Sequence, residues 1–315
     1  MRVLVCEFVT GGGMRSEHLP PSLAREGAMM RDALLRDLSE LAGVEAVATS
    51  DDRLAPPPCG EIHDVRERDD VWKAWASLAR GCDVAWPIAP ETGGVLSRLA
   101  RLLGETGVDV IGPSEEAIAI ASSKFLTAQR LRERGVPTPP VWRVSAAPDH
   151  TSPVVVKPDD GAGCDATLFL EEPPASIPAG SIVQPFVAGE AASLTVLRAH
   201  GATRLLSANR QHVAIEDGAF RFQGLTVGAI EDADGRLAAL ARAVGDALPG
   251  LDGIFGIDLV LGADGPVVIE INPRLTTAYC GLRESLGLNP VSLVPPFDVA
   301  PLAAWAGARP VEVRL

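Results

Sequence analysis

Lysine is scarce in this chain. Among its 315 residues are 28 basic ones, and only Lys73, Lys124 and Lys157 are lysines while the rest are arginines. Acidic residues outnumber the basic ones, so that the formal net charge at pH 7 is −13. A protein this acidic is not expected to bind nucleic acid or anionic membranes nonspecifically, because both require a basic surface. Any phosphate group that binds here must therefore be held by a few local cations.

Long apolar runs and paired cysteines are missing as well. No stretch of about 18 apolar residues occurs, and the segment from Met1 to Glu7 is typical of a strand rather than of a signal peptide. The five cysteines are scattered, and none forms a C-x-x-C pair. We therefore expect a cytoplasmic protein with reduced thiols and no zinc site. The sequence leaves the oligomeric state open, with a homodimer as one option.

The most informative stretch is Val267–Arg274, an apolar strand that proline ends. Because side chains alternate along a strand, we expect Val268, Glu270 and Asn272 to share one face. A glutamate in an otherwise apolar strand requires a cation, a strong donor or the edge of a cleft. The stretch therefore predicts either a binding site or an ordinary hairpin with a salt-bridged acid.

A second apolar strand, Gly256–Leu261, precedes this stretch and contains one acid, Asp258. The turn residues between the two strands predict a hairpin. Either register of the hairpin brings Asp258 close to Glu270 and Asn272. Carboxylate and amide oxygens of this kind hold Mg²⁺ together with substrate phosphates.

Residues 1–112 are expected to form a small α/β unit with a parallel sheet. Its predicted strands are Arg2–Phe8, Val44–Ala48, Asp83–Ile88 and Val108–Ile111. Ligands of such sheets bind at the carboxyl ends of the strands, where Glu7, Gly11–Gly13 and Glu91–Gly94 are expected. Glu7 and Glu91 are thus either substrate contacts or solvated loop acids. Gly12 and its neighbours lack the spacing of a dinucleotide-binding turn, and we expect them to allow close approach of a substrate or a neighbouring strand.

The middle of the chain contains candidate nucleotide-binding segments. A helical pattern runs from Ser114 to Arg134 and includes Lys124. A β-rich run ends at Lys157 and is followed by a loop with Gly161 and Gly163, whose amides and lysine suit an oxyanion. The spacing is not that of a Walker loop.

The next strand, Ser181–Val187, is followed by Glu190, and this apolar hinge with polar flanks suits a purine and its ribose hydroxyls. The strands expected after it are antiparallel and are followed by a helix, the hairpin and a short tail. These elements are the strands Ala192–Arg198, Arg204–Arg210 and Phe220–Gly224, the helix Asp234–Leu248, a short helix Leu302–Ala306 and a strand Val311–Leu315.

The order of these motifs between Pro113 and Pro290 resembles that of the ATP-grasp ligase family. The resemblance implies a mixed α/β and α+β fold, with ATP between two lobes. We expect an N-terminal pre-ATP-grasp α/β domain over residues 1–112, a small central lobe over 113–190 and a C-terminal antiparallel-sheet lobe over 191–315.

The resemblance also implies a role for each matching residue, with ATP and two Mg²⁺ ions that Mn²⁺ can replace. The phosphates would be contacted by Lys124, Lys157, Gly161 and Gly163, the adenine by Phe186 and Val187, and the ribose by Glu190. The metal ions would be held by Asp258, Glu270 and Asn272. The reacting groups would be stabilised by Lys157, Arg274 and Arg210. Gln184 stands where many relatives carry an acid for the adenine amino group, which leaves its contact with adenine open.

The implied reaction is amide formation through an acyl phosphate, with a small carboxylate and an amine as substrates. The segments Glu7–Gly13, Pro90–Gly93 and Lys157–Cys164 are similar to the branch that joins glutamate to tyramine or tyrosine in methanofuran-type cofactor biosynthesis. The positions assigned to ATP and metal all lie from Lys124 onwards, and an acid suits a protonated amino group, so we expect Glu7, Gly12 and Glu91 to contact the amine. The alternatives are a D-alanine ligase-like dipeptide-forming enzyme and a nucleotide-binding module without catalysis.

Overall fold

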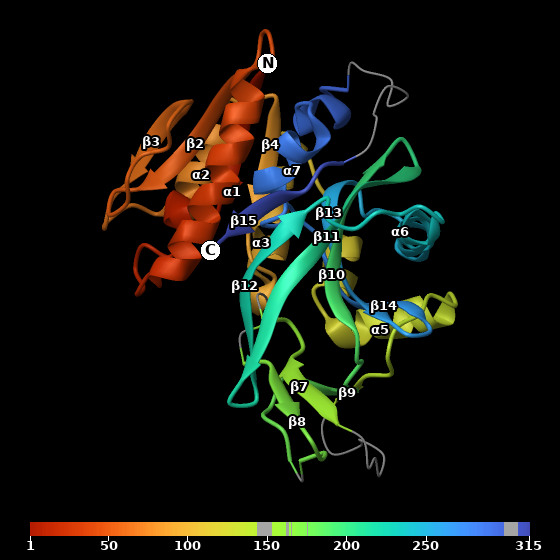
Figure 1. Ribbon diagram of the computed structural model, residues 1–315. Coiled ribbons are helices and arrows are strands. Elements are labelled where there is room, and N and C mark those ends of the chain that lie inside the picture. Colours follow the sequence, from red (N-terminus) through yellow and green to blue (C-terminus); the bar gives the residue numbers. More distant parts are fainter. Residues whose placement is uncertain (144–152, 162–163, 165, 175, 299–307) are drawn as a thin grey trace.

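The computed structural model describes residues 1–143, 153–161, 164, 166–174, 176–298 and 308–315. An N-terminal α/β unit packs against a long, curved sheet, whose far end carries a small lobe (Figure 1). Among the helices of these ranges, none has the length and apolar character that crossing a membrane would require.

The N-terminal unit is built on a parallel sheet with the strand order β3-β2-β1-β4-β5. Its strands are β1 (Arg2–Glu7), β2 (Glu45–Asp51), β3 (Glu61–Val65), β4 (Val84–Ile88) and β5 (Asp109–Val110). Strand β3 was not expected, because three of its five residues are polar or charged and it forms the edge of the sheet. The other four strands and the parallel arrangement confirm the prediction for this unit.

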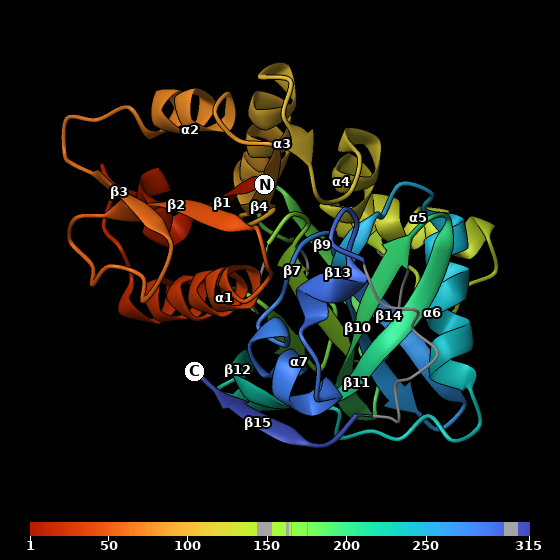
Figure 2. The same cartoon turned by 90° about the horizontal axis from the view of Figure 1, so that it is seen from above.

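Helices cover both faces of this sheet (Figure 2). The helices are α1 (Pro21–Ser39), α2 (Val71–Ala79) and α3 (Val95–Glu105). Val3 and Val5 of β1 belong to the cluster that includes α1, while Leu4 and Cys6 belong to the cluster of α2 and α3. Strand β1 is apolar throughout because its alternating side chains are buried on both faces.

The rest of the chain forms a ten-stranded sheet in the order β14-β13-β10-β11-β12-β8-β7-β9-β6, with β15 paired to β12. Its strands are β6 (Trp142–Arg143), β7 (Val154–Pro158), β8 (Leu168–Leu170), β9 (Ser181–Pro185), β10 (Glu190–Ala199), β11 (Ala202–Glu216), β12 (Ala219–Val227), β13 (Gly253–Gly262), β14 (Gly265–Asn272) and β15 (Val311–Arg314). All its pairings are antiparallel, which was expected for the strands from Ala192 to Asn272. The small lobe of β6–β9 joins the large one where Leu168 pairs with Ala219.

Helices α4 (Glu115–Ala121), α5 (Lys124–Glu133) and α6 (Arg236–Ala247) contribute to the core on one face of the large lobe. The single helix expected from Ser114 to Arg134 is divided into α4 and α5, because the Ser123 side chain accepts a hydrogen bond from the Leu126 amide and caps a new helix. Lys124 thus lies at the first position of α5. The predicted helix Leu302–Ala306 lies outside the described residues.

Helix α7 (Tyr279–Leu286) and a short turn, η3 (Pro290–Leu293), were not predicted. Helix α7 contacts α1 and joins the two units around Asp37, whose side chain is fully buried. The Asp37 carboxylate accepts hydrogen bonds from Tyr279 Oη at 2.9 Å and from Arg283 Nη1 at 3.0 Å. Both partners lie far from Asp37 in the sequence, so a local pattern could not indicate this contact.

Candidate active site

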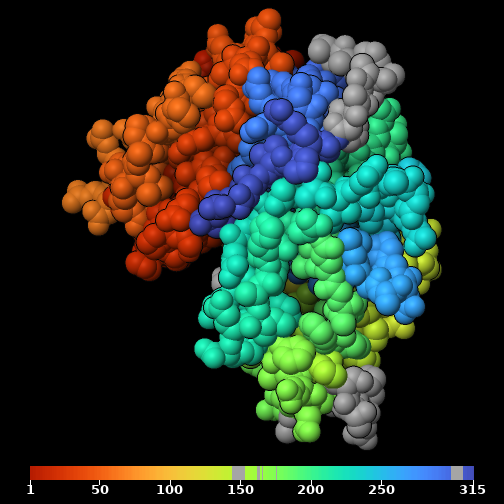
Figure 3. Space-filling view, in the orientation of Figure 1, coloured from red at the N-terminus to blue at the C-terminus, as the bar shows by residue number. Residues whose placement is uncertain are grey.

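A pocket lies between the small lobe and the large lobe, with an empty volume of about 1170 Å³ that includes open solvent. In Figure 3 the surface is hollowed between the small lobe and the large sheet. The strands β7, β9, β10, β11, β12, β13 and β14 all contribute lining residues.

Strand β7 places the phosphate-binding candidate Lys157 in the pocket, because its side chains alternate between the two faces of the sheet. Val154 and Val156 pack with Val183 in the small hydrophobic cluster of this lobe. Val155 and Lys157 therefore point to the opposite face and line the pocket. The Lys157 side chain is 6% exposed, so its ammonium is withdrawn from water.

The hairpin of β13 and β14 places Asp258 directly opposite Glu270. A β-bulge follows, because Leu259 pairs with Val268 and Ile269 is the extra residue. The bulge turns Val268 into the hydrophobic core with Ile271, while Ile269 lines the pocket beside Glu270. The expectation that Val268 would share a face with Glu270 and Asn272 is therefore wrong.

Glu270 meets both predicted phosphate-binding lysines. Its Oε2 lies 3.3 Å from Lys124 Nζ and 3.7 Å from Lys157 Nζ. Burial alone would raise the pKa of Glu270, but the two lysine charges outweigh it and hold the pKa well below its usual range. Burial lowers the pKa of Lys157, which the charge of Glu270 opposes. Two of the three lysines of the chain thus converge on one carboxylate.

Asp258 carries the second carboxylate of the pocket. It accepts hydrogen bonds from Gln211 Nε2 at 3.0 Å and from Asn272 Nδ2 at 3.1 Å. Burial, followed by the charge of Glu270, raises the pKa of Asp258. Among the described residues, no group of three or more His, Cys, Asp and Glu side chains is arranged to hold a metal ion. Two carboxylates and one amide instead suit Mg²⁺, which keeps several ligand positions for water and substrate phosphate.

The loop after β7 is tied to the start of α5. The Asp159 carboxylate accepts hydrogen bonds from Ser123 Oγ, from the Phe125 amide at 2.8 Å and from Arg143 Nη2 at 2.6 Å. Lys124 Nζ donates a hydrogen bond to the carbonyl oxygen of Gly161. The structure therefore fixes Lys124 and this loop relative to each other. Gly163 lies outside the described residues.

The wall expected to hold adenine contains one polar group without a partner. Gln184 is 3% exposed and lines the pocket, and its Oε1 accepts no hydrogen bond from the described residues. Phe186 and Val187 line the pocket beside it. A buried carbonyl oxygen without a donor is costly unless a ligand supplies one.

Glu190 and Arg210 are not brought into the lining of this pocket. They pair with each other, and their side chains are 43% and 48% exposed. Their sequence neighbours Ala191 and Gln211 line the pocket instead, because alternate residues of β10 and β11 face opposite sides. The assignments of Glu190 to ribose and of Arg210 to the acyl phosphate stay predictions without a supporting contact.

Arg274 lines the pocket just after β14. Its Nη2 contacts Glu91 Oε2 at 3.0 Å, and its Nε, which is buried, has no partner among the described residues. Glu91 comes from the N-terminal unit but is only 5% exposed and does not line the pocket. Its Oε2 therefore holds Arg274, while its buried Oε1 has no partner among the described residues.

Glu7 is also withdrawn from the pocket. It is 2% exposed and accepts hydrogen bonds from the amides of Val9 and Thr10 and from Thr10 Oγ1. These bonds shape the turn η1 (Val9–Gly13). A side chain on Gly12, whose φ is +103°, would meet Val65 at 2.7 Å. The structure therefore places Glu7 and Gly12 in internal packing and not at a substrate, which corrects the expected amine site.

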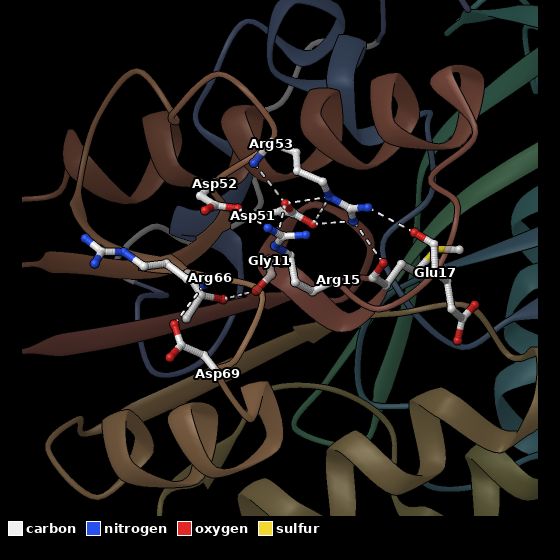
Figure 4. Close-up of polar contacts among 10 residues, drawn as sticks. Gly11, Arg15, Glu17, Asp51, Asp52, Arg53, Arg66 and Asp69 are labelled. Atoms are coloured by element: carbon white, nitrogen blue, oxygen red, sulfur yellow. Dashed lines mark hydrogen bonds and ion pairs between the residues drawn. The ribbon is translucent and has the colours of Figure 1, made fainter.

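The segment after this turn is held by an ion cluster (Figure 4). Arg53 contacts the fully buried Asp51 at 2.6 Å and donates hydrogen bonds to the carbonyl oxygens of Met14 and Glu17, each at 2.9 Å. Arg15 contacts Asp52 at 2.8 Å. These contacts occupy the carboxyl end of β2. The polar side chains at that part of the sheet edge therefore stabilise the fold.

Several lining residues were not anticipated. They include Glu26 of α1, Gln211 of β11, Phe222 and Leu225 of β12, and the segment Thr276–Ala278. Glu26 is one of several acids along a helix, and its position in the pocket depends on packing between distant elements. The alternation of β11 could have indicated Gln211, because it is adjacent to Arg210 on the opposite face.

Comparison with protein families agrees with this architecture. A model of the ATP-grasp domain matches residues 121–278, which is half of the chain, and a model of a pre-ATP-grasp domain matches residues 44–118. The chain belongs to the ATP-grasp family. The expected ATP-grasp fold, with its parallel N-terminal unit and antiparallel lobe, is confirmed. ATP-grasp enzymes use ATP and a divalent metal ion.

Curated relatives of this ATP-grasp chain include two ligases. Tyramine–L-glutamate ligase of Methanocaldococcus jannaschii is 27% identical over 91% of this chain and 86% of the relative. The enzyme of the same name from Methanocaldococcus fervens is 27% identical over 89% of each chain. An ATP-grasp superfamily protein of Archaeoglobus fulgidus has a similar structure, with a TM-score of 0.80, 23% identity and coverage of 100% of this chain and 92% of that chain. An L-amino acid ligase of Bacillus licheniformis shares the fold with a TM-score of 0.63, 16% identity and coverage of 93% and 72%.

Proposed function

We propose that this protein is an ATP-dependent, ADP-forming ligase that joins a carboxylate to an amine, with glutamate and tyramine or tyrosine as its substrates. The observation that carries the proposal is the arrangement around Glu270, which contacts two buried lysines and pairs with Asp258 in one pocket. The named activity of the curated relatives supports the choice of substrates.

In this proposal, ATP occupies the space between the lobes. Gln184 Oε1 accepts a hydrogen bond from the adenine amino group, which satisfies its buried oxygen. Phe186 and Val187 border the base, and Glu190 is assigned to the ribose. Lys124 and Lys157 turn from Glu270 towards the phosphates, because a phosphate carries more negative charge than the carboxylate that now holds them.

Asp258, Glu270 and Asn272 would hold the metal ions, of which we propose two. The donor set fits, because hard oxygen ligands and a gap towards the phosphate side are what Mg²⁺ requires. When bound, the metal neutralises phosphate charge and orients the transferring group. Asn272 would present its amide oxygen, while its Nδ2 donates to Asp258 as it does in the present structure.

The reaction would proceed in two steps. An oxygen of the donor carboxylate attacks the γ-phosphorus, ADP leaves, and an acyl phosphate forms. The ammonium group of the acceptor first loses a proton to solvent, and its nitrogen then attacks the acyl carbon. A second N–H proton is lost as the amide forms, and phosphate leaves with the bridging oxygen. Arg274, whose Nε has no partner among the described residues, is positioned to donate to the acyl phosphate while Glu91 orients it.

The direct test is ADP release by the purified protein with ATP, Mg²⁺ and a panel of acids and amines. We expect ADP release that requires both L-glutamate and tyramine or tyrosine, and an amide of matching mass. ADP release with D-alanine alone would replace the proposal with a dipeptide-forming enzyme. ATP binding without ADP release from any pair would indicate a nucleotide-binding module.

A further inference from the structure

The pocket has lining residues to which the proposed ATP and metal sites assign no role. Glu26 of α1, the segment after β14 and the strands β11 and β12 form the region that contains them. Its lining residues are Glu26, Thr277, Ala278, Phe222 and Leu225. Because an acid and apolar side chains face the same space, the region suits a ligand with a positive end and an apolar body.

Glu26 contributes a carboxylate that is only partly engaged. The side chain is partly buried, and Oε1 accepts a hydrogen bond from Thr277 Oγ1. Within the described ranges, no hydrogen bond or ion pair reaches Oε2. The nearby guanidinium of Arg274 is directed to Glu91 instead. A carboxylate oxygen left in a pocket favours a ligand that brings N–H donors and positive charge.

The neighbouring wall is apolar. Phe222 packs against the hydrophobic cluster that contains Leu225 and Ala278, and all three residues also line the pocket. An amino-acid donor carries polar groups over most of its surface and would leave this wall unfilled. An amine on an aromatic or alkyl group has one ammonium for the acid and an apolar body for the wall.

We infer that Glu26 holds the ammonium group of the acceptor amine, and that Phe222 and Leu225 hold its apolar body. The inference rests on the proposed ligase function and adds where the acceptor binds and which residues hold its two ends. It also moves the amine site from Glu7 and Glu91 to a different acid of the same N-terminal unit.

The test compares Glu26→Gln with Glu17→Gln, an exposed acid of the segment before α1 that serves as a charge-matched control. We expect Glu26→Gln to raise KM for the amine by about ten-fold or more, because a charge-assisted hydrogen bond is lost. In Glu26→Gln, the KM values for ATP and for the donor should stay within about three-fold of those of the unaltered enzyme. In the control Glu17→Gln, the KM values for all three substrates should stay within the same range.

Two further measurements separate binding from a structural role. Donor activation is measured without the amine by trapping the acyl phosphate with hydroxylamine, and Glu26→Gln should leave hydroxamate formation unchanged. Phe222→Ala should weaken the binding of an arylalkyl amine more than the binding of a short alkyl amine.

Three results would overturn the inference. The first is equal behaviour of Glu26→Gln and Glu17→Gln. The second is loss of hydroxamate formation by the same factor as amide formation, which would assign Glu26 to the donor. The third is an equal effect of Phe222→Ala on the KM of an arylalkyl amine and on the KM of a short alkyl amine. If the unaltered protein releases no ADP with any pair, the proposed function itself fails, and the inference fails with it.

Discussion

Lys157 is the cation whose surroundings best suit phosphate. It is buried beside Glu270, whereas Lys73 is 85% exposed on α2 and pairs with Asp70. We expect Lys157→Ala to lower kcat/KM for ATP by about 100-fold or more, because a desolvated charge aimed at phosphate is lost. Lys73→Ala is the matched control and should not change it. Equal losses in steady-state kinetics would contradict the assignment.

Glu270 is the acid on which the metal assignment depends. Glu270→Gln keeps the shape of the side chain but removes a charge that both lysines share. We expect a folded protein whose Mg²⁺-dependent turnover drops by about 100-fold or more. The measurement is a titration of activity with Mg²⁺, with circular dichroism as the folding control. Full activity at limiting Mg²⁺ would exclude a role in metal binding.

The proposed orientation of the adenine base can be tested at Gln184. Its buried Oε1 should accept from the adenine amino group, so the unaltered enzyme should prefer ATP over the 6-deamino purine nucleotide by about five-fold. Gln184→Leu should abolish this preference. Gln129→Leu, on the exposed side of α5, should retain it. A preference that survives in Gln184→Leu would place the adenine edge elsewhere.

At the scale of single residues, the sequence indicated the site where strand alternation and scarce residue types were informative. Lys157, Glu270 and Asn272 are of this kind, since each follows or ends an apolar run. Glu26 could not be identified in this way, because nothing within α1 distinguishes it from the other acids of the helix. Its place in the pocket arises from the packing of α1 beside the segment after β14.

At the scale of elements, the hairpin of β13 and β14 was correctly predicted, but its bulge was not. The bulge depends on how β14 pairs with β13. In an apolar run such as Val267–Ile269, the sequence does not show which residue is the extra one. The turn η1 is a similar case. Its glycines and Glu7 looked accessible in sequence, yet Gly11 faces Thr49 of β2 and Gly12 faces Val65 of β3.

The turn η1 gives a prediction for stability. Glu7→Gln would place an amide N–H₂ against the amides that now donate to the carboxylate. We expect a loss of about 1–3 kcal/mol in the free energy of unfolding, measured by urea denaturation. Glu17→Gln should be neutral in the same assay, since that side chain is exposed. An unchanged stability together with a raised KM for the amine would restore Glu7 as a substrate contact.

At the scale of the whole molecule, the sequence predicted the two kinds of sheet but not how they join. The small lobe is continuous with the large sheet through the pairing of Leu168 and Ala219, and α7 joins α1 around Asp37. Both contacts link segments far apart in the chain. The domain limits after residues 112 and 190 stay a proposal, because the sheet itself runs across the second limit.

The whole arrangement has one chemical purpose in this account, which is to convert a carboxylate into an acyl phosphate. Donor glutamate with oxygen-18 in its carboxylates therefore provides the most direct measurement, with ATP and tyramine as the other substrates. We predict ADP, phosphate and amide in equal amounts, with one oxygen-18 atom transferred to the phosphate. Amide formed with unlabelled phosphate, or with AMP as the nucleotide product, would contradict the account.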